Sequence, residues 1–303
     1  MFKKILFATT ATPACDDAAR VAFELAARHG AKLVVYHVLG VPTRAFSPFI
    51  KDMRTGEEIA MDDEYKAWVL EELKNTYARQ LARCATVEVD CATGYPHREI
   101  LRKARQEDAD LIVMGASTRD TDEPTYRSGI AGSTMQRVAK AARCPVLTVA
   151  RPAASYWGGF SNIVFGTDFS KPADSAFQFA YKAAKESNSE LHLFHSLDIS
   201  SVSSGVVLSQ DEIEDKIIAA RDKMRTRYVA KMEDFTNWDI EVWEGVPYVE
   251  IVKFARERQA DLIVMAHHTR EADPDKAMIG STVEQVILRA TCPVVSVNRP
   301  DKV

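Results

Sequence analysis

The sequence of 303 residues has no apolar run that approaches the roughly 20 residues a helix needs to cross a bilayer. Residues 1–7 hold two lysines and then a short apolar run, and threonines and an aspartate soon follow. That pattern is typical of a first strand and not of a cleaved leader. We therefore expect a cytoplasmic protein with no membrane partner.

An excess of positive charge is also missing. The chain has 39 Lys and Arg residues against 43 Asp and Glu residues, a formal net charge of −4. Contacts to phosphate drive sequence-independent nucleic-acid binding, so we expect no nucleic-acid partner. The five cysteines are an odd number without any Cys-x-x-Cys pair, which favours a reducing compartment over a disulfide framework.

Known phosphate-binding glycine motifs are absent as well. The 13 glycines form neither Gly-x-x-x-x-Gly-Lys-Ser/Thr nor a Gly-x-Gly-x-x-Gly after an apolar run, so any nucleotide site must be of another kind. No nucleophile–base–orienter set and no carboxylate pair stands at a pocket position. The sequence therefore gives no reason to expect an enzyme.

What the sequence does have is a duplication. The hexapeptide Ala-Asp-Leu-Ile-Val-Met occurs at 109–114 and again at 260–265, 151 positions later. Gly-Ser-Thr at 132–134 returns at 280–282, and Cys-Pro-Val at 144–146 returns at 292–294, each 148 positions later. A period this long indicates tandem domains and not a solenoid. We predict two domains, 1–152 and 153–303, with residues 153–159 as the linker.

Each half alternates short apolar runs with helical patterns, as expected for the α/β class. The runs are 5–8, 33–37, 87–89, 111–114 and 146–149, matched by 163–165, 191–194, 240–242, 262–265 and 294–297. Continuous Val/Ile/Leu runs suit strands buried on both faces of a parallel sheet. We predict two doubly wound five-stranded parallel sheets, with the flavodoxin-like strand order 3-2-1-4-5.

Local signals mark where several helices begin. Thr12 with the next residue Pro13 opens the first helix, and Ser170 opens its counterpart in the second half. Ser209 and Glu212 form a capping box. The apolar stripe that follows (Ile213, Ile217, Ala220, Met224, Tyr228 and Met232) is predicted to be one face of a single helix.

A ligand of such a sheet lies beyond the carboxyl ends of the strands, where the strand order reverses. Thr10 and Gly115 stand there in the first half, and Thr167, Asp168 and Ala266 stand there in the second. The two Gly-Ser-Thr segments begin the fourth helix of each half. They are either an anion site, built from backbone N–H groups and hydroxyls, or simply a capping turn, and the spacing leaves both open.

These residues resemble the universal stress protein family, as a tandem two-domain member. The resemblance rests on Thr-Asp-Phe-Ser at 167–170, on His37 and His195 at the ends of second strands, on Gly-x-Pro before the third helix, and on the duplicated segments above. It implies an adenine nucleotide alpha hydrolase-like fold and dimerisation through the last strand. It also implies ATP binding through Gly-x2-Gly-x9-Gly-Ser/Thr plus an aspartate after the first strand.

Both halves depart from that ATP motif. In the first half Gly115, Gly132 and Ser133 match, but Thr118 replaces the second glycine and Thr10 the aspartate. In the second half the aspartate and the last two motif positions match, while both earlier glycines are replaced. Its loop, residues 270–276, carries three carboxylates against two cations, and carboxylates close to a triphosphate cost affinity.

Two hypotheses follow. The first is a stress-response protein that binds an adenine nucleotide such as ATP, with Mg²⁺, weakly and in one domain. The second is a regulatory or protein-interaction scaffold that takes no ATP or takes another small ligand. The candidate residues in the second half are Thr167, Asp168 at the base, Ala266, and Gly280, Ser281 and Thr282 near ribose and phosphates. Those in the first half are Thr10, Val38 against the base, Gly115, Gly132, Ser133 and Thr134.

Other reactive residues are assigned structural roles. His267 and His268 precede three carboxylates, but adjacent side chains at a strand end diverge, so we expect no metal site. His37 and His195 are predicted to be hydrogen-bonded structural histidines, and Cys144 and Cys292 to be core residues. The last strands, 146–149 and 294–297, are apolar edges that we expect to pair with one another as an internal pseudo-dimer. Association of whole chains into a homodimer is left open.

Overall fold

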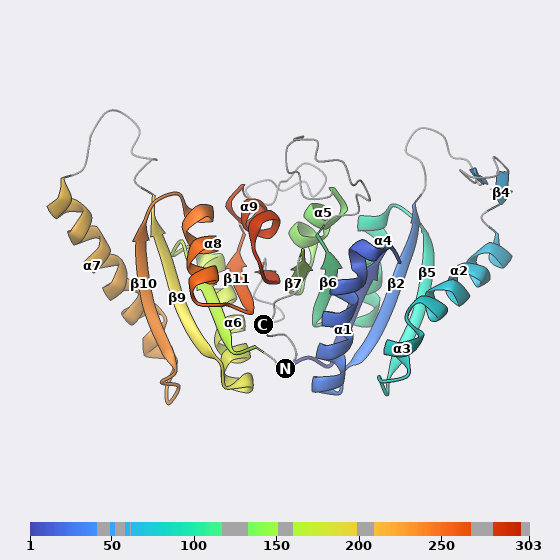
Figure 1. Cartoon of the computed structure of the whole chain (residues 1–303), viewed down its shortest axis with the longest axis horizontal. Coiled ribbons are helices and arrows are strands. Elements are labelled where there is room, and N and C mark those ends of the chain that lie inside the picture. The colour runs from blue at the N-terminus through green and yellow to red at the C-terminus, as the bar shows by residue number, and fades with distance from the viewer. Residues whose placement is uncertain are drawn as a thin grey trace.

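A computed structural model describes residues 1–40, 49–51, 58–60, 62–116, 133–150, 160–198, 209–267 and 281–297. The described strands form one ten-stranded sheet with helices on both faces, together with a separate two-stranded ribbon (Figure 1). The first half contributes β1 (Lys4–Thr9), β2 (Lys32–Gly40), β5 (Val87–Gly94), β6 (Leu111–Gly115) and β7 (Val146–Val149). The second contributes β8 (Asn162–Gly166), β9 (Glu190–Leu197), β10 (Trp238–Glu244), β11 (Leu262–Ala266) and β12 (Val294–Val297).

The sheet runs β10-β9-β8-β11-β12-β7-β6-β1-β2-β5. Counted within each half, that is strand order 3-2-1-4-5, as predicted, and all strands of one half are parallel. β2 and β5 are longer than their apolar runs, and Cys91 lies inside β5. The two-stranded ribbon, β3 (Phe49–Lys51) and β4 (Glu58–Ala60), was not predicted.

Alternate residues of each buried strand face two separate apolar cores. In β1, Ile5 and Phe7 belong to one core, and Leu6 and Ala8 belong to the other. The first core lies under α1 (Asp16–His29), α2 (Asp63–Thr76), α3 (Ala78–Leu81), α6 (Lys171–Ser187) and α7 (Gln210–Arg227). The second lies under α4 (Pro96–Glu107), α5 (Ser133–Ala141), α8 (Pro247–Glu257) and α9 (Ser281–Arg289). Each core contains residues of both halves, so the apolar interior is continuous across the junction.

The two halves meet through their last strands, which pair with one another as predicted, and the pairing is antiparallel. Leu147 of β7 lies opposite Val295 of β12, in the middle of the paired segment. On one face of the junction Gln136 donates a hydrogen bond to Glu284 at 2.6 Å. On the other face the Phe2 and Phe179 rings lie 6.1 Å apart. The protein thus contains its own pseudo-dimer.

Most of the predicted helix starts are present with their capping hydrogen bonds. Ser170 accepts the Ala173 N–H at the start of α6, and both bonds of the capping box are present at α7. Cys144 and Cys292 are buried, as predicted. Two details differ. Pro13 opens a 3₁₀ turn (Pro13–Cys15) before α1, and α7 ends at Arg227, followed by a second 3₁₀ turn (Val229–Lys231).

The predicted apolar stripe therefore does not form one helical face. Tyr228 and Met232 lie beyond the end of α7, although both are buried in the same core as Met224. The predicted linker and domain boundary fall outside the described residues and stay predictions. None of the described helices is both long enough and apolar enough to span a bilayer.

Candidate functional crevices

The first half has a cavity of about 260 Å³ at the carboxyl ends of β1 and β6, the neighbouring strands between which the strand order reverses. Four of the candidate residues of this half line it: Thr10, Val38, Gly115 and Thr134. They come from the end of β1, from β2, from the end of β6 and from the start of α5. The strand order therefore brings together residues that are more than 100 positions apart in the sequence.

The second half repeats this arrangement with a cavity of about 240 Å³. Thr167, Asp168, Ala266 and Thr282 all line it, together with Ser196, the counterpart of Val38. Asp168 is exposed, and its Oδ1 accepts a hydrogen bond from the Ser170 N–H at 2.9 Å. The carboxylate is thereby fixed at the mouth of the crevice. We call these two cavities the first and second crevice.

Ser133 and Ser281 are the first residues of α5 and α9, as the Gly-Ser-Thr segments predicted. Gly132 and Gly280 lie outside the described residues, as do Thr118, His268 and the acidic loop 270–276. The choice between an anion site and a capping turn therefore stays open.

The loop after the first strand of each half has the same internal support. Thr9 Oγ1 lies 2.6 Å from Tyr77 Oη, and Thr167 Oγ1 lies 2.7 Å from Tyr228 Oη. Each threonine hydroxyl also accepts a backbone N–H two residues on, from Ala11 at 2.9 Å and from Phe169 at 3.0 Å.

The supported backbone is strained at the same place in both halves. Ala11 has φ of 57° and Phe169 has φ of 60°, in the left-handed region that residues with a side chain rarely occupy. Such strain persists only where the surroundings hold it, and here the threonine–tyrosine pairs do so. The conformation of the loop that borders each crevice is consequently held by the tyrosine that directly follows the second helix of each half.

His37 and His195 have the predicted structural role. His37 Nδ1 donates to Thr9 O at 2.9 Å, and His195 Nδ1 donates to Thr167 O at 2.8 Å. Since a carbonyl only accepts, both rings carry the proton on Nδ1. Burial lowers the pKa of both histidines, and the hydrogen bond to the backbone only partly opposes it. Both rings are therefore neutral near pH 7.

The comparisons with known proteins agree with this duplicated geometry. The sequence pattern described as "Universal stress protein family" matches residues 1–150 and again residues 159–298. The chain belongs to the universal stress protein family.

Its relatives match it one half at a time. A universal stress protein of Thermus aquaticus is 34% identical over 152 residues, which is 49% of this chain and 99% of the relative. One from Methanocaldococcus jannaschii is 32% identical over 147 residues, 47% of this chain and 85% of the relative. A solved universal stress protein from Archaeoglobus fulgidus resembles the whole fold, with a TM-score of 0.68 at 20% identity, over 99% of this chain and 97% of that one.

The two crevices of this universal stress protein differ in chemistry. The described residues that line the first crevice include no Asp, Glu, Lys or Arg, and Thr10 stands where the second half has Asp168. The second crevice is lined by Asp168, Ser196 and the buried His267, but by no Lys or Arg among the described residues. Among the described lining residues, the duplication thus left a carboxylate in the second crevice only.

An arginine fixes the loop of the second crevice and not that of the first. Arg227 at the end of α7 contacts both carboxylate oxygens of Asp174, at 2.7 and 2.9 Å. It also donates to Phe169 O at 2.7 Å and to Ser170 O at 2.9 Å, the carbonyls of the two residues that follow Asp168. The hydrogen bond from Arg227 lowers the pKa of Asp174. In the first half Thr76 occupies the corresponding position, before Tyr77.

Several lining residues were missed by the sequence argument. Ser196 was recoverable, because it stands 158 positions after Val38, the offset of the other strand residues. Cys15 and Tyr36 of the first crevice, and Ile251 of the second, carry no sequence signal that separates them from core residues. His267 was weighed only as a metal ligand.

One group among the described residues has the geometry to approach a metal ion, namely Glu190, His192 and Asp239. His192 Nδ1 lies 2.6 Å from Asp239 Oδ1, and the other Asp239 oxygen is 3.1 Å from Arg258. An ion pair with a guanidinium already uses that carboxylate. The group lies between β9 and β10 and takes no part in either crevice.

Proposed function

We propose that this universal stress protein binds an adenine nucleotide weakly in the second crevice and serves a cytoplasmic stress response through that binding. The observation that carries the proposal is the position of Asp168 at the mouth of a cavity at the switch point of strand order. That is where an open α/β sheet accepts ligands. A fixed carboxylate there suits the exocyclic amino group of adenine.

The phosphates have a second means of support. Thr282 and Val283, in the first turn of α9, line the same cavity. The first turn of a helix offers unpaired backbone N–H groups and the positive end of the helix dipole, both of which favour a phosphate. Ser281 and Gly280 are the residues that we assign to this contact.

Weak binding follows from the charges. No Lys or Arg is among the described residues that line the crevice, and the sequence adds the acidic segment 270–276. A triphosphate therefore needs Mg²⁺ to offset its charge. We expect no ATP site in the first crevice, because Thr10 replaces the carboxylate.

A second candidate is a regulatory scaffold whose crevices take no ATP. The first crevice favours it, since its described lining is uncharged and suits at most a neutral small ligand. The two candidate functions differ in whether they predict that a nucleotide stabilises the protein.

Thermal unfolding with millimolar Mg·ATP tests the proposal. We expect the nucleotide to raise the Tm of the wild type, because a ligand that binds only the folded state stabilises it. Asp168→Asn and Ser281→Ala should reduce that increase. Thr10→Val, at the matching position of the first half, should leave it unchanged. If Mg·ATP does not raise the Tm of the wild type, the nucleotide-binding proposal is wrong and the scaffold function remains.

A further inference from the structure

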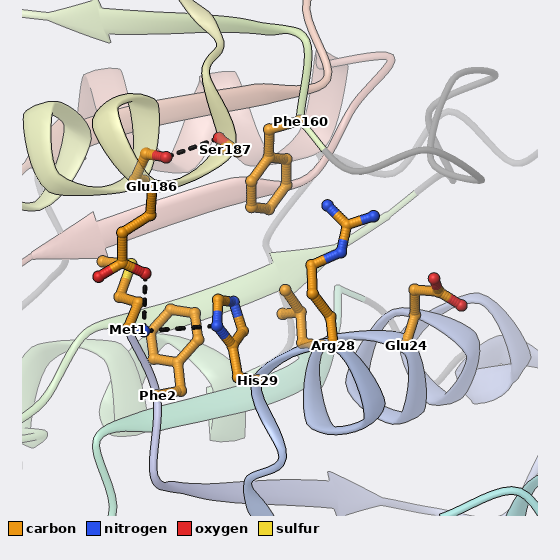
Figure 2. Close-up of a pocket in the computed structure, with 10 residues that line it drawn as sticks. Met1, Phe2, Glu24, Arg28, His29, Phe160, Glu186 and Ser187 are labelled. Carbon is orange, nitrogen blue, oxygen red and sulfur yellow. Dashed lines mark hydrogen bonds and ion pairs between the residues drawn. The ribbon is translucent and has the colours of Figure 1, made fainter.

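A third cavity lies on the pseudo-twofold axis, at the amino ends of the strands, whereas both crevices lie at the carboxyl ends. Its volume is about 280 Å³, and Figure 2 shows it between the carboxyl ends of α1 and α6. It is lined by Met1, Phe2, Glu24, Leu25, Arg28 and His29 of the first half and by Phe160, Ala183, Glu186 and Ser187 of the second. These residues border the amino ends of the strands, whereas a nucleotide belongs at the carboxyl ends.

The two sides of this axial cavity are related by the duplication but are not alike. Phe160 stands 158 positions after Phe2, and both rings line the cavity. Glu186 stands 158 positions after Arg28, so the charge at that position is reversed. A symmetric homodimer would place like charges on the two sides, whereas this chain places opposite ones.

One cation of the lining has no ion-pair partner among the residues that the structure describes. The Met1 amine pairs with Glu186 at 2.6 Å, which compensates that carboxylate. Within the described part of the chain, the Arg28 guanidinium has no ion-pair partner, and Figure 2 shows it reaching toward Phe160. A guanidinium binds a carboxylate through two parallel hydrogen bonds. Since Glu24 also lines the cavity, a ligand with several negative charges is disfavoured.

A second donor faces the same space. The Met1 amine lies 3.4 Å from His29 Nδ1, and since an ammonium only donates, Nδ1 accepts. The ring proton is therefore on Nε2, which Figure 2 shows on the side of the ring that faces Arg28. Burial, more than the neighbouring charges, lowers the pKa of His29, so the ring stays neutral near pH 7.

Apart from Ser187, whose hydroxyl donates to Ala183 O, the remaining surface is apolar and aromatic. Phe2 and Phe160 line opposite sides, and Leu25 and Ala183 come from the facing helices α1 and α6. Aromatic rings attract a further ring in stacked or edge-to-face contact beyond the effect of burial alone. The cavity volume is near the lower limit of about 300 Å³ for small-molecule pockets, so we expect a small ligand.

We propose that the axial cavity binds a small aromatic carboxylate, with its carboxylate on Arg28 and His29 and its ring between Phe2 and Phe160. Because the ligand contacts both halves, it stabilises their pairing. This proposal does not depend on the proposed nucleotide site, because the two sites lie at opposite ends of the strands.

The probe is 3-phenylpropionate, titrated into the full chain by calorimetry. Its controls are 3-phenylpropanol and 3-phenylpropylamine, which keep the ring and the alkyl chain but replace the negative charge with none or with a positive one. We expect saturable binding of the acid at one site per chain, with affinity at least about tenfold higher than that of either control. Mg·ATP should not displace it.

Arg28→Gln tests the assigned cation and should weaken the acid at least about tenfold, with little effect on the alcohol. Arg20→Gln is the matched control, on the same helix but paired with Asp17. Ala183→Met fills the cavity and should abolish binding of all three compounds. Equal affinity for the three compounds, no saturable binding of the acid at about 10 mM, or an unchanged affinity in Arg28→Gln would overturn the proposal.

Discussion

Two half-buried histidines, His37 and His195, make the stability of this fold depend on pH. His37 and His195 donate from Nδ1 to the carbonyls of Thr9 and Thr167, and burial holds their pKa below 6.5. Below pH 6.5 these histidines therefore bind protons more readily in the unfolded chain than in the folded chain. Their contribution to stability is therefore complete above pH 6.5 and is lost as the pH falls through the folded pKa.

We predict that the wild type is less stable at pH 5.5 than at pH 7.5, by chemical denaturation at each pH. The double variant His37→Asn/His195→Asn should show a shallower loss between the two values. The double variant should still lose some stability at pH 5.5, because the pKa of His29 is lowered as well. If the two proteins lose the same free energy of unfolding over this interval, these rings are not its source.

Residue-level predictions from the sequence succeed where the interaction is local or repeated. The cap of Ser209 by Glu212 was predictable because both partners lie within one turn. Thr10 and Gly115 were predictable as neighbours once the strand order was known. The support of Thr9 by Tyr77 was not, because the tyrosine lies 68 residues away in the sequence and no local pattern marks it.

At the scale of single elements, α7 does more than cover the sheet. Its last residue, Arg227, connects α6 through Asp174 to the loop that carries Asp168. The predicted continuous helix to Met232 is wrong because Tyr228 turns inward to reach Thr167. A tertiary hydrogen bond thus ends the helix, and helical periodicity alone does not reveal it.

We predict that Arg227→Met lowers the free energy of unfolding by about 2 kcal/mol, since hydrogen bonds to charged groups contribute about 1.5–3 kcal/mol and this site is partly solvated. Arg225→Met is the matched control, because Arg225 only pairs with Asp222 on the helix surface. We expect it to cost less than about 0.5 kcal/mol. Similar losses in the two variants, measured by urea unfolding, would show that the contacts of Arg227 with Asp174 and the loop do not stabilise the fold.

At the scale of the whole molecule, the junction is specific for unlike halves. Gln136 and Glu284 stand 148 positions apart at equivalent sites and bond to each other across the axis. Pairing two copies of the second half would place Glu284 against itself. The pairing of the last strands was predictable from their apolar edges, but this polar contact was not, because neither residue stands out in its helix.

We predict that Gln136→Glu lowers the free energy of unfolding by about 1–3 kcal/mol, as expected when a partly buried hydrogen bond is replaced by like charges. The exchanged double variant Gln136→Glu/Glu284→Gln should restore most of that loss. The measurement is a double-mutant cycle by denaturant unfolding. Additive effects would mean that the two side chains do not interact in solution.

The central claim is that duplication produced two like crevices, of which only the second takes an adenine nucleotide. Calorimetric titration of the full chain with Mg·ATP measures this directly, because it counts sites. We predict one weak site per chain, lost in Asp168→Asn and retained in Thr10→Val. Two equivalent sites, or no heat at millimolar ATP, would contradict the account.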